Sequence, residues 1–139
     1  MYDAHTWRPY CHVRDFSRLI GRVLEAPSEK INFEVFNAGG DANNFTKEMI
    51  VGEIRKFIKT GTVEYKVKGS DPRNYKVDFR KVSERLVFTP EFTIRDGVQE
   101  LLQAFENRRF EDVESQKNFY GNYHIEYETA KETASSWAK

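Results

Sequence analysis

Short strand-like runs alternate with amphipathic helical segments along the chain, and this alternation constrains the fold most strongly. Apolar and polar residues alternate over 33–37 and 63–67, and 10–13 is a third β-prone run. Alternation with a period of two is typical of a half-buried strand. Because the strand-like runs are interleaved with helices, the sequence predicts an α/β fold. Three short strands make a small sheet, so we expect several apolar faces to lack a partner within this chain.

Four helical segments are predicted from apolar residues spaced three and four apart. The first is expected after Asp15 as N-cap, and its apolar stripe consists of Phe16, Leu19, Ile20, Val23 and Leu24. Short polar side chains can accept the unpaired N–H groups of a first helical turn. On this basis we expect Thr46 and Asp78 to cap the second and third helices, and Thr93 and Asp96 to form a capping box before the fourth.

Length and charge set the class of protein. The 139 residues are the size of one domain, which we place at 1–127, followed by a polar tail at 128–139. Lysine and arginine number 22, as do aspartate and glutamate, so no basic excess favours nucleic acid. One cysteine excludes an internal disulfide, and the longest apolar runs are too short to cross a membrane. With no signal-peptide pattern at Met1, we expect a cytoplasmic protein that contacts neither nucleic acid nor membrane.

The residues that could carry catalysis are few. His5, His12 and His124 lack the paired spacing of a zinc site, and Cys11 beside His12 would point to the opposite face of a strand. We therefore predict no metal site and no catalytic residue. Gly39-Gly40 follows a predicted strand but matches neither phosphate-loop pattern, which favours a turn that needs positive φ.

Two arginines are candidates for a different role. Arg8 precedes the first strand-like run, and Arg73 lies in a tight loop over 71–75. The planar guanidinium group, with five donors, suits phosphate oxygens. Solvated surface charge is the alternative interpretation of both residues.

Six short motifs resemble, in order, the C-terminal part of extended short-chain dehydrogenases/reductases. These are the NAD-dependent nucleotide-sugar epimerases and dehydratases. The resemblance covers about residues 7–106 and is carried by WRPYCHVRD at 7–15, EVFNAG at 34–39, FTKEMI at 45–50, DPRNYKVD at 71–78, LVFTP at 86–90 and IRDGV at 94–98.

The resemblance implies a small mixed α/β substrate-binding domain that holds the diphosphate of a nucleotide sugar. Arg8 and Arg73 would contact that diphosphate from opposite sides, with Lys68 as a lesser candidate. The family pattern has glycine where this chain has Val87. If the position is a left-handed helix cap, a β-branched residue there costs about 1 kcal/mol or more.

The family's Gly-rich NAD motif and its Tyr-x-x-x-Lys pair in the N-terminal half are missing here. The one Tyr-x-x-x-Lys match, Tyr127 with Lys131, lies in the polar tail. The intact family enzyme would use NAD, whereas we expect this chain alone to bind none and to be inactive. Its expected partners are a nucleotide sugar and either the missing Rossmann half or a second copy, through faces such as Phe16/Ile20/Val23 and 33–36. A non-catalytic module that binds a nucleotide sugar or a protein is the alternative.

Overall fold

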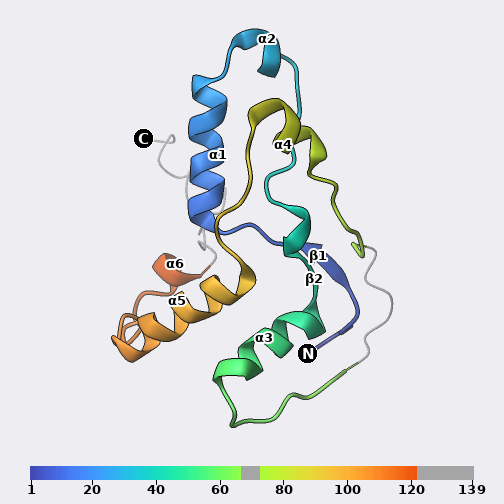
Figure 1. Cartoon of the computed structure of the whole chain (residues 1–139). Helices are drawn as coiled ribbons and strands as arrows, with labels where there is room; N and C mark the ends of the chain where they lie inside the picture. The colour runs from blue at the N-terminus through green and yellow to red at the C-terminus, as the bar shows by residue number, and fades with distance from the viewer. Residues whose placement is uncertain (67–72, 122–139) are drawn as a thin grey trace, which may run out of the picture. The chain divides into compact units, whose positions relative to one another are not determined.

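The computed structural model describes residues 1–66 and 73–121 (Figure 1). The chain divides into two compact units, 1–103 and 104–139, which are considered separately. The first unit contains β1 (Trp7–Pro9), α1 (Val13–Glu25), α2 (Ser28–Ile31), the 3₁₀ turn η1 (Asp41–Asn43), β2 (Asn44–Thr46), α3 (Lys47–Phe57), α4 (Arg80–Leu86) and most of α5 (Ile94–Glu106). The second contains the end of α5 and α6 (Lys117–Tyr120). The predicted tail, 128–139, lies outside the described residues.

The sheet has two antiparallel strands in the described part of the chain. Trp7 is opposite Thr46, Arg8 opposite Phe45 and Pro9 opposite Asn44. Helices and a small sheet therefore coexist, and the expectation of a mixed α/β domain is confirmed at this level.

The predicted strand at 10–13 is wrong. The strand lies at Trp7–Pro9, and Val13 already begins α1. The N-cap of α1 is His12 rather than Asp15, because the Nδ1 of His12 accepts a hydrogen bond from the Arg14 N–H at 3.2 Å. The helix thus starts earlier than Asp15 suggests, and Asp15 lies inside its first turn, fully buried.

The other two predicted strands do not form within the described residues. Phe33 adopts a left-handed turn conformation with φ of 58°, and 34–38 pairs with no strand. Of 63–67, Lys66 makes a single parallel bridge with Tyr2, and position 67 lies outside the described residues. Both segments have strand-like patterns, but a strand forms only where another backbone pairs with it.

Local capping follows the sequence more closely. Thr46 caps α3 by accepting the Met49 N–H at 3.1 Å. Before α5, the Thr93 N–H donates to the Asp96 carboxylate at 2.8 Å and the Asp96 N–H donates back to the Thr93 hydroxyl, so the capping box is confirmed. The Asp78 carboxylate accepts the Arg80 N–H at 2.8 Å, although Phe79 occupies the N-cap position of α4.

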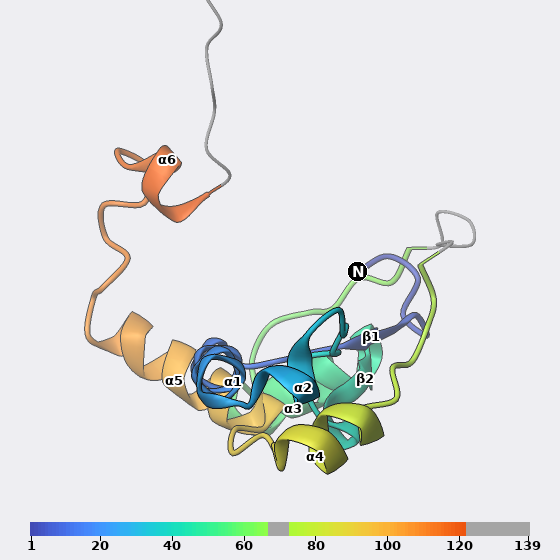
Figure 2. The same ribbon diagram turned by 90° about the horizontal axis from the view of Figure 1, so that it is seen from above.

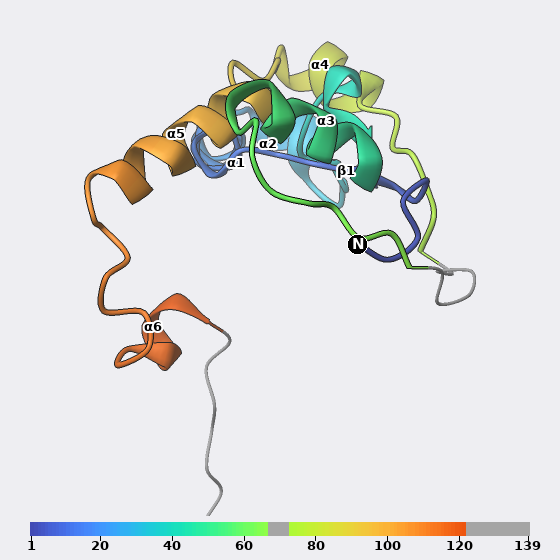
Figure 3. The ribbon, with the colours of Figure 1, turned by 90° about the horizontal axis from the view of Figure 1, so that it is seen from below.

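The core of the first unit joins α1 to α4 and to the segments that flank α4 (Figure 2, Figure 3). Its buried side chains are Leu19, Phe79, Val82, Leu86 and Phe88. Residues of the segment before η1, including Phe36 and Ala38, pack against this cluster while remaining partly exposed. The core is small, and the sheet with its loops lies beside it.

Candidate functional site

The end of the 71–78 loop is attached to the two-stranded sheet by asparagine side chains. The Trp7 N–H in β1 donates to the Asn74 carbonyl oxygen at 2.9 Å. In β2, Asn44 accepts the Val77 N–H at 3.0 Å and donates to the Val77 carbonyl at 2.9 Å. These bonds replace a third strand's ladder and fix the segment that begins at Arg73.

Arg8 lies against this segment. Its guanidinium carbon is 5.6 Å from the centroid of the Tyr75 ring, within the range of a cation–π contact, and its Nη1 donates to the Trp7 carbonyl at 2.8 Å. Arg73, exposed, precedes Tyr75 by two residues. The structure thus brings together the segments that carry the two candidate arginines, whereas Lys68 lies outside the described residues.

Aromatic rings and cations alternate over this surface. Lys76 Nζ lies 3.6 Å from the centroid of the Trp7 ring, and Tyr75 is half exposed beside Arg8. Burial raises the pKa of the nearby Tyr10, and the charge of Arg8 opposes that shift. Guanidinium groups can bind phosphate oxygens, and an exposed aromatic ring can stack on a planar base. The sequence analysis missed the aromatic residues here; the signal was the direct adjacency of Arg73, Asn74, Tyr75 and Lys76.

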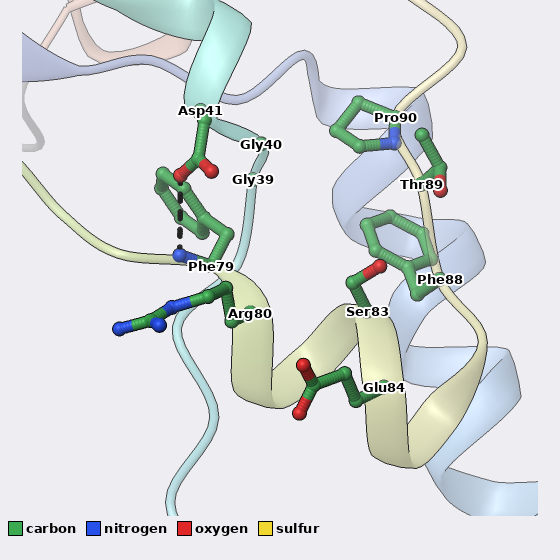
Figure 4. Close-up of a pocket in the computed structure, with 10 residues that line it drawn as sticks. All are labelled: Gly39, Gly40, Asp41, Phe79, Arg80, Ser83, Glu84, Phe88, Thr89 and Pro90. Atoms are coloured by element: carbon green, nitrogen blue, oxygen red, sulfur yellow. Dashed lines mark hydrogen bonds between the residues drawn. The ribbon is translucent and has the colours of Figure 1, made fainter.

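The Gly39-Gly40 turn borders a separate pocket of about 240 Å³ (Figure 4). Gly39 has φ of 142°, which confirms the prediction of a positive-φ turn. A Cβ on Gly39 would lie 2.8 Å from Phe79 Cε1, and one on Gly40 would lie 2.8 Å from Pro90 Cγ. These rings therefore occupy the space that a dinucleotide's pyrophosphate would need, so this turn does not fit NAD.

Polar side chains also line the pocket, but they are part of its framework or open to solvent. The Asp41 carboxylate accepts the Phe79 N–H at 3.3 Å, shown as a dashed line in Figure 4. Ser83, Glu84 and Thr89 are exposed at its rim. Because Phe79 and Phe88 form a buried floor, the pocket is a surface depression over the core.

Asp15 is the buried charge that the sequence analysis assigned to the wrong role. Its two carboxylate oxygens accept the N–H groups of Glu91 and Phe92, each at 3.0 Å, and Oδ1 lies 2.6 Å from Arg18 Nη1. Asp15 therefore ties α1 to the segment before α5. These contacts account for both carboxylate oxygens, and the role is structural.

Cys11 and His12 do not form a catalytic pair in the structure. His12 Nε2 lies 2.8 Å from the Glu100 carboxylate, while its ring stacks on Phe92 at 4.5 Å. Burial, followed by the charge of Asp15, raises the pKa of the Cys11 thiol and so disfavours the reactive thiolate.

Residues 1–66 and 73–121 contain no group of three or more metal-ligating side chains that could hold a metal ion, and His124 lies outside them. In the same residues, no helix combines the length and apolar character that crossing a bilayer requires. A scan against models of known protein families finds none that matches this chain.

Proposed function

We propose that this chain is the substrate-binding portion of an NAD-dependent nucleotide-sugar epimerase/dehydratase, an extended short-chain dehydrogenase/reductase of the cytoplasm. Its role is to hold the nucleoside-diphosphate group. One observation carries the proposal: Trp7 bonds to Asn74 and Arg8 packs on Tyr75, so two arginine-bearing segments converge beside exposed aromatic rings. The order of six sequence motifs supports the family.

The residues suit the chemistry of a diphosphate. Arg8 and Arg73 each offer a planar fork that can donate two parallel hydrogen bonds to phosphate oxygens, and such charge-assisted bonds contribute about 1.5–3 kcal/mol each. Tyr75 offers a ring on which a planar base can stack. Lys68 attracts phosphate as a point charge.

The chemical step belongs to the other half of such an enzyme. In the intact family, hydride transfer from the sugar to NAD⁺ begins the reaction. The Gly39-Gly40 turn is filled by Phe79 and Pro90 and does not fit that cofactor. We therefore expect no reduction of added NAD by this chain alone, and the same observation favours the second candidate function, a non-catalytic nucleotide-sugar-binding module.

Calorimetric titration of the full chain with UDP-glucose, GDP-mannose and dTDP-glucose tests the binding role. Arg8→Lys and Arg73→Lys each keep the charge but lose the fork, so the affinity for the preferred ligand should fall about tenfold or more. Arg108→Lys and Arg109→Lys, in the second unit, should bind like the parent. Each variant's thermal midpoint, measured without ligand, separates lost binding from lost folding.

The outcomes distinguish the candidates. Binding without NAD reduction supports a substrate-binding portion. A parent chain that binds none of the three nucleotide sugars, or Arg8→Lys and Arg73→Lys variants that bind as tightly as the parent, would refute the diphosphate site. Reduction of NAD by the purified chain would refute the assignment of the chemistry to a separate half.

A further inference from the structure

Residues 34–38 have the geometry of a strand but no partner strand. Their exposure alternates: Glu34, Phe36 and Ala38 are half-buried, whereas Val35 is 79% exposed and Asn37 is exposed. This period of two is that of an extended chain. In the part of the chain that the structure describes, none of the backbone N–H groups of 35–38 donates a hydrogen bond.

One edge of this segment is already occupied. Lys81 Nζ donates to the Val35 carbonyl at 2.7 Å, and the Asn37 side chain donates to the Asp78 carbonyl at 3.3 Å. The residues around α4 therefore lie along that edge, and pairing with another strand would use the opposite one.

An apolar groove of about 280 Å³ adjoins the segment. It lies between α1 and the segment that follows α2, and apolar side chains form its lining: Phe16, Leu19, Ile20, Val23, Leu24, Phe36 and Ala38. Leu24 is 80% exposed, and Phe16 and Ile20 are each about half exposed. Because Phe36 and Ala38 belong to both features, the groove and the unpaired segment form one continuous surface.

Whatever covers this surface must supply backbone carbonyls along 35–38, which a second strand does and a helix does not. We propose that the occupant is a second copy of this chain, with 34–38 of the two copies paired antiparallel about a two-fold axis. Self-pairing gives each free N–H a carbonyl partner and closes the assembly at two copies. The two α1 helices then lie on the same face, with their exposed stripes next to each other.

The charges permit this pairing. The centre of the segment, Val35-Phe36, is uncharged. Glu34 is paired with Lys81 at 2.7 Å and with Arg85, which together lower the pKa of its carboxyl, so the two copies bring no uncompensated like charges together. A stable interface buries about 800 Å² per partner, and one helix stripe with a five-residue strand offers less, so the dimer is concentration-dependent.

Sedimentation equilibrium of the full chain over a hundredfold range of concentration tests the proposal. The parent should shift from monomer to dimer. Ile20→Asp places a carboxylate in the groove, and it should raise the dissociation constant at least tenfold. Met49→Asp is the matched control, because Met49 on α3 is 42% exposed and Ile20 is 49% exposed. It should dimerise like the parent, and far-UV circular dichroism checks that each variant folds.

Cysteine cross-linking tests the pairing itself. In a Cys11→Ser background, Val35→Cys and Asn37→Cys, alone and mixed, should give disulfide-linked dimers on mild oxidation, because paired strands bring Cα atoms within about 7 Å. Lys59→Cys, which lies after α3 and away from the groove, should not cross-link.

A chain that remains monomeric at every concentration overturns the proposal and leaves the surface to another occupant, such as a Rossmann half. A dimer that survives Ile20→Asp and cross-links no better at 35 and 37 than at 59 also overturns it. Arg8→Lys and Arg73→Lys should leave the dimer unchanged, so the failure of the diphosphate site and the failure of the dimer are separate results.

Discussion

Val87 ends α4 in a backbone conformation that a valine adopts only at a cost. Its φ of 50° and ψ of 44° lie in the left-handed region, and it is the C-cap of the helix. An L-residue loses about 1–2 kcal/mol in this region, and β-branching makes the crowding worse. The expectation that this position needs a left-handed cap is therefore confirmed, and the chain carries the strain.

Replacing Val87 should therefore raise the free energy of unfolding. The side chain is 76% exposed, so truncating it forfeits only about 0.4 kcal/mol of apolar burial. Glycine relieves the strain but adds freedom to the unfolded chain that costs about 0.5–1 kcal/mol, whereas asparagine tolerates the conformation without that cost. We expect gains of about 1 kcal/mol for Val87→Asn and about 0.5 kcal/mol for Val87→Gly.

Urea unfolding and thermal melting followed by circular dichroism measure these gains. For a unit of this size, 1 kcal/mol corresponds to roughly 4–8 °C in Tm. Val87→Ile keeps the β-branch and should leave the stability near that of the parent. If Val87→Asn and Val87→Gly both lower the free energy of unfolding, the strain argument is refuted.

Two further predictions concern carboxylates. Asp15→Ala removes the acceptor for the N–H groups of 91–92 and leaves the partly buried Arg18 unpaired, so it should cost about 3–5 kcal/mol by urea unfolding, and a cost under 1 kcal/mol would contradict the structural role. Hydrogen bonds from the Thr93 hydroxyl and N–H hold the pKa of Asp96 below its ordinary value near about 3.9, so its contribution is complete above that pH and is lost as pH falls through the lowered pKa. Unfolding measured between pH 6 and pH 2 should therefore show less acid sensitivity in Asp96→Ala than in the parent, and equal slopes would contradict this.

The helices were predictable because their signals are local. The apolar stripe of α1, the Thr46 cap of α3 and the capping box before α5 all depend on residues within eight positions of one another. The left-handed cap at Val87 belongs to the same class, since it follows from where α4 ends. Such patterns specify structure without information from the rest of the chain.

The strands and the buried carboxylate were not predictable from local patterns. The 34–38 segment alternates like a strand, yet no backbone in the described residues pairs with it. Asp15 is a plausible cap by sequence, but it bonds to backbone groups 76 and 77 positions away. For the site, the sequence identified Arg8 and Arg73 as candidates, whereas the contact of Arg8 with Tyr75 required the three-dimensional structure.

Asparagine and aspartate side chains provide much of the long-range order that a larger sheet would otherwise supply. Buried backbone groups must find hydrogen-bond partners, and a two-stranded sheet with three residues per strand satisfies few of them. Side chains satisfy others at sequence separations of 33 to 77: Asn44 to Val77, Asp41 to Phe79, Asn43 to Phe92, Asn74 to Trp7 and Asp15 to Glu91 and Phe92. Two of these, Asn44 and Asn74, fix the segment that begins at Arg73. The position of the candidate diphosphate site therefore depends on side-chain amides rather than on the hydrophobic core, and substitutions in α1 or α4 and substitutions in β2 should affect stability and binding separately.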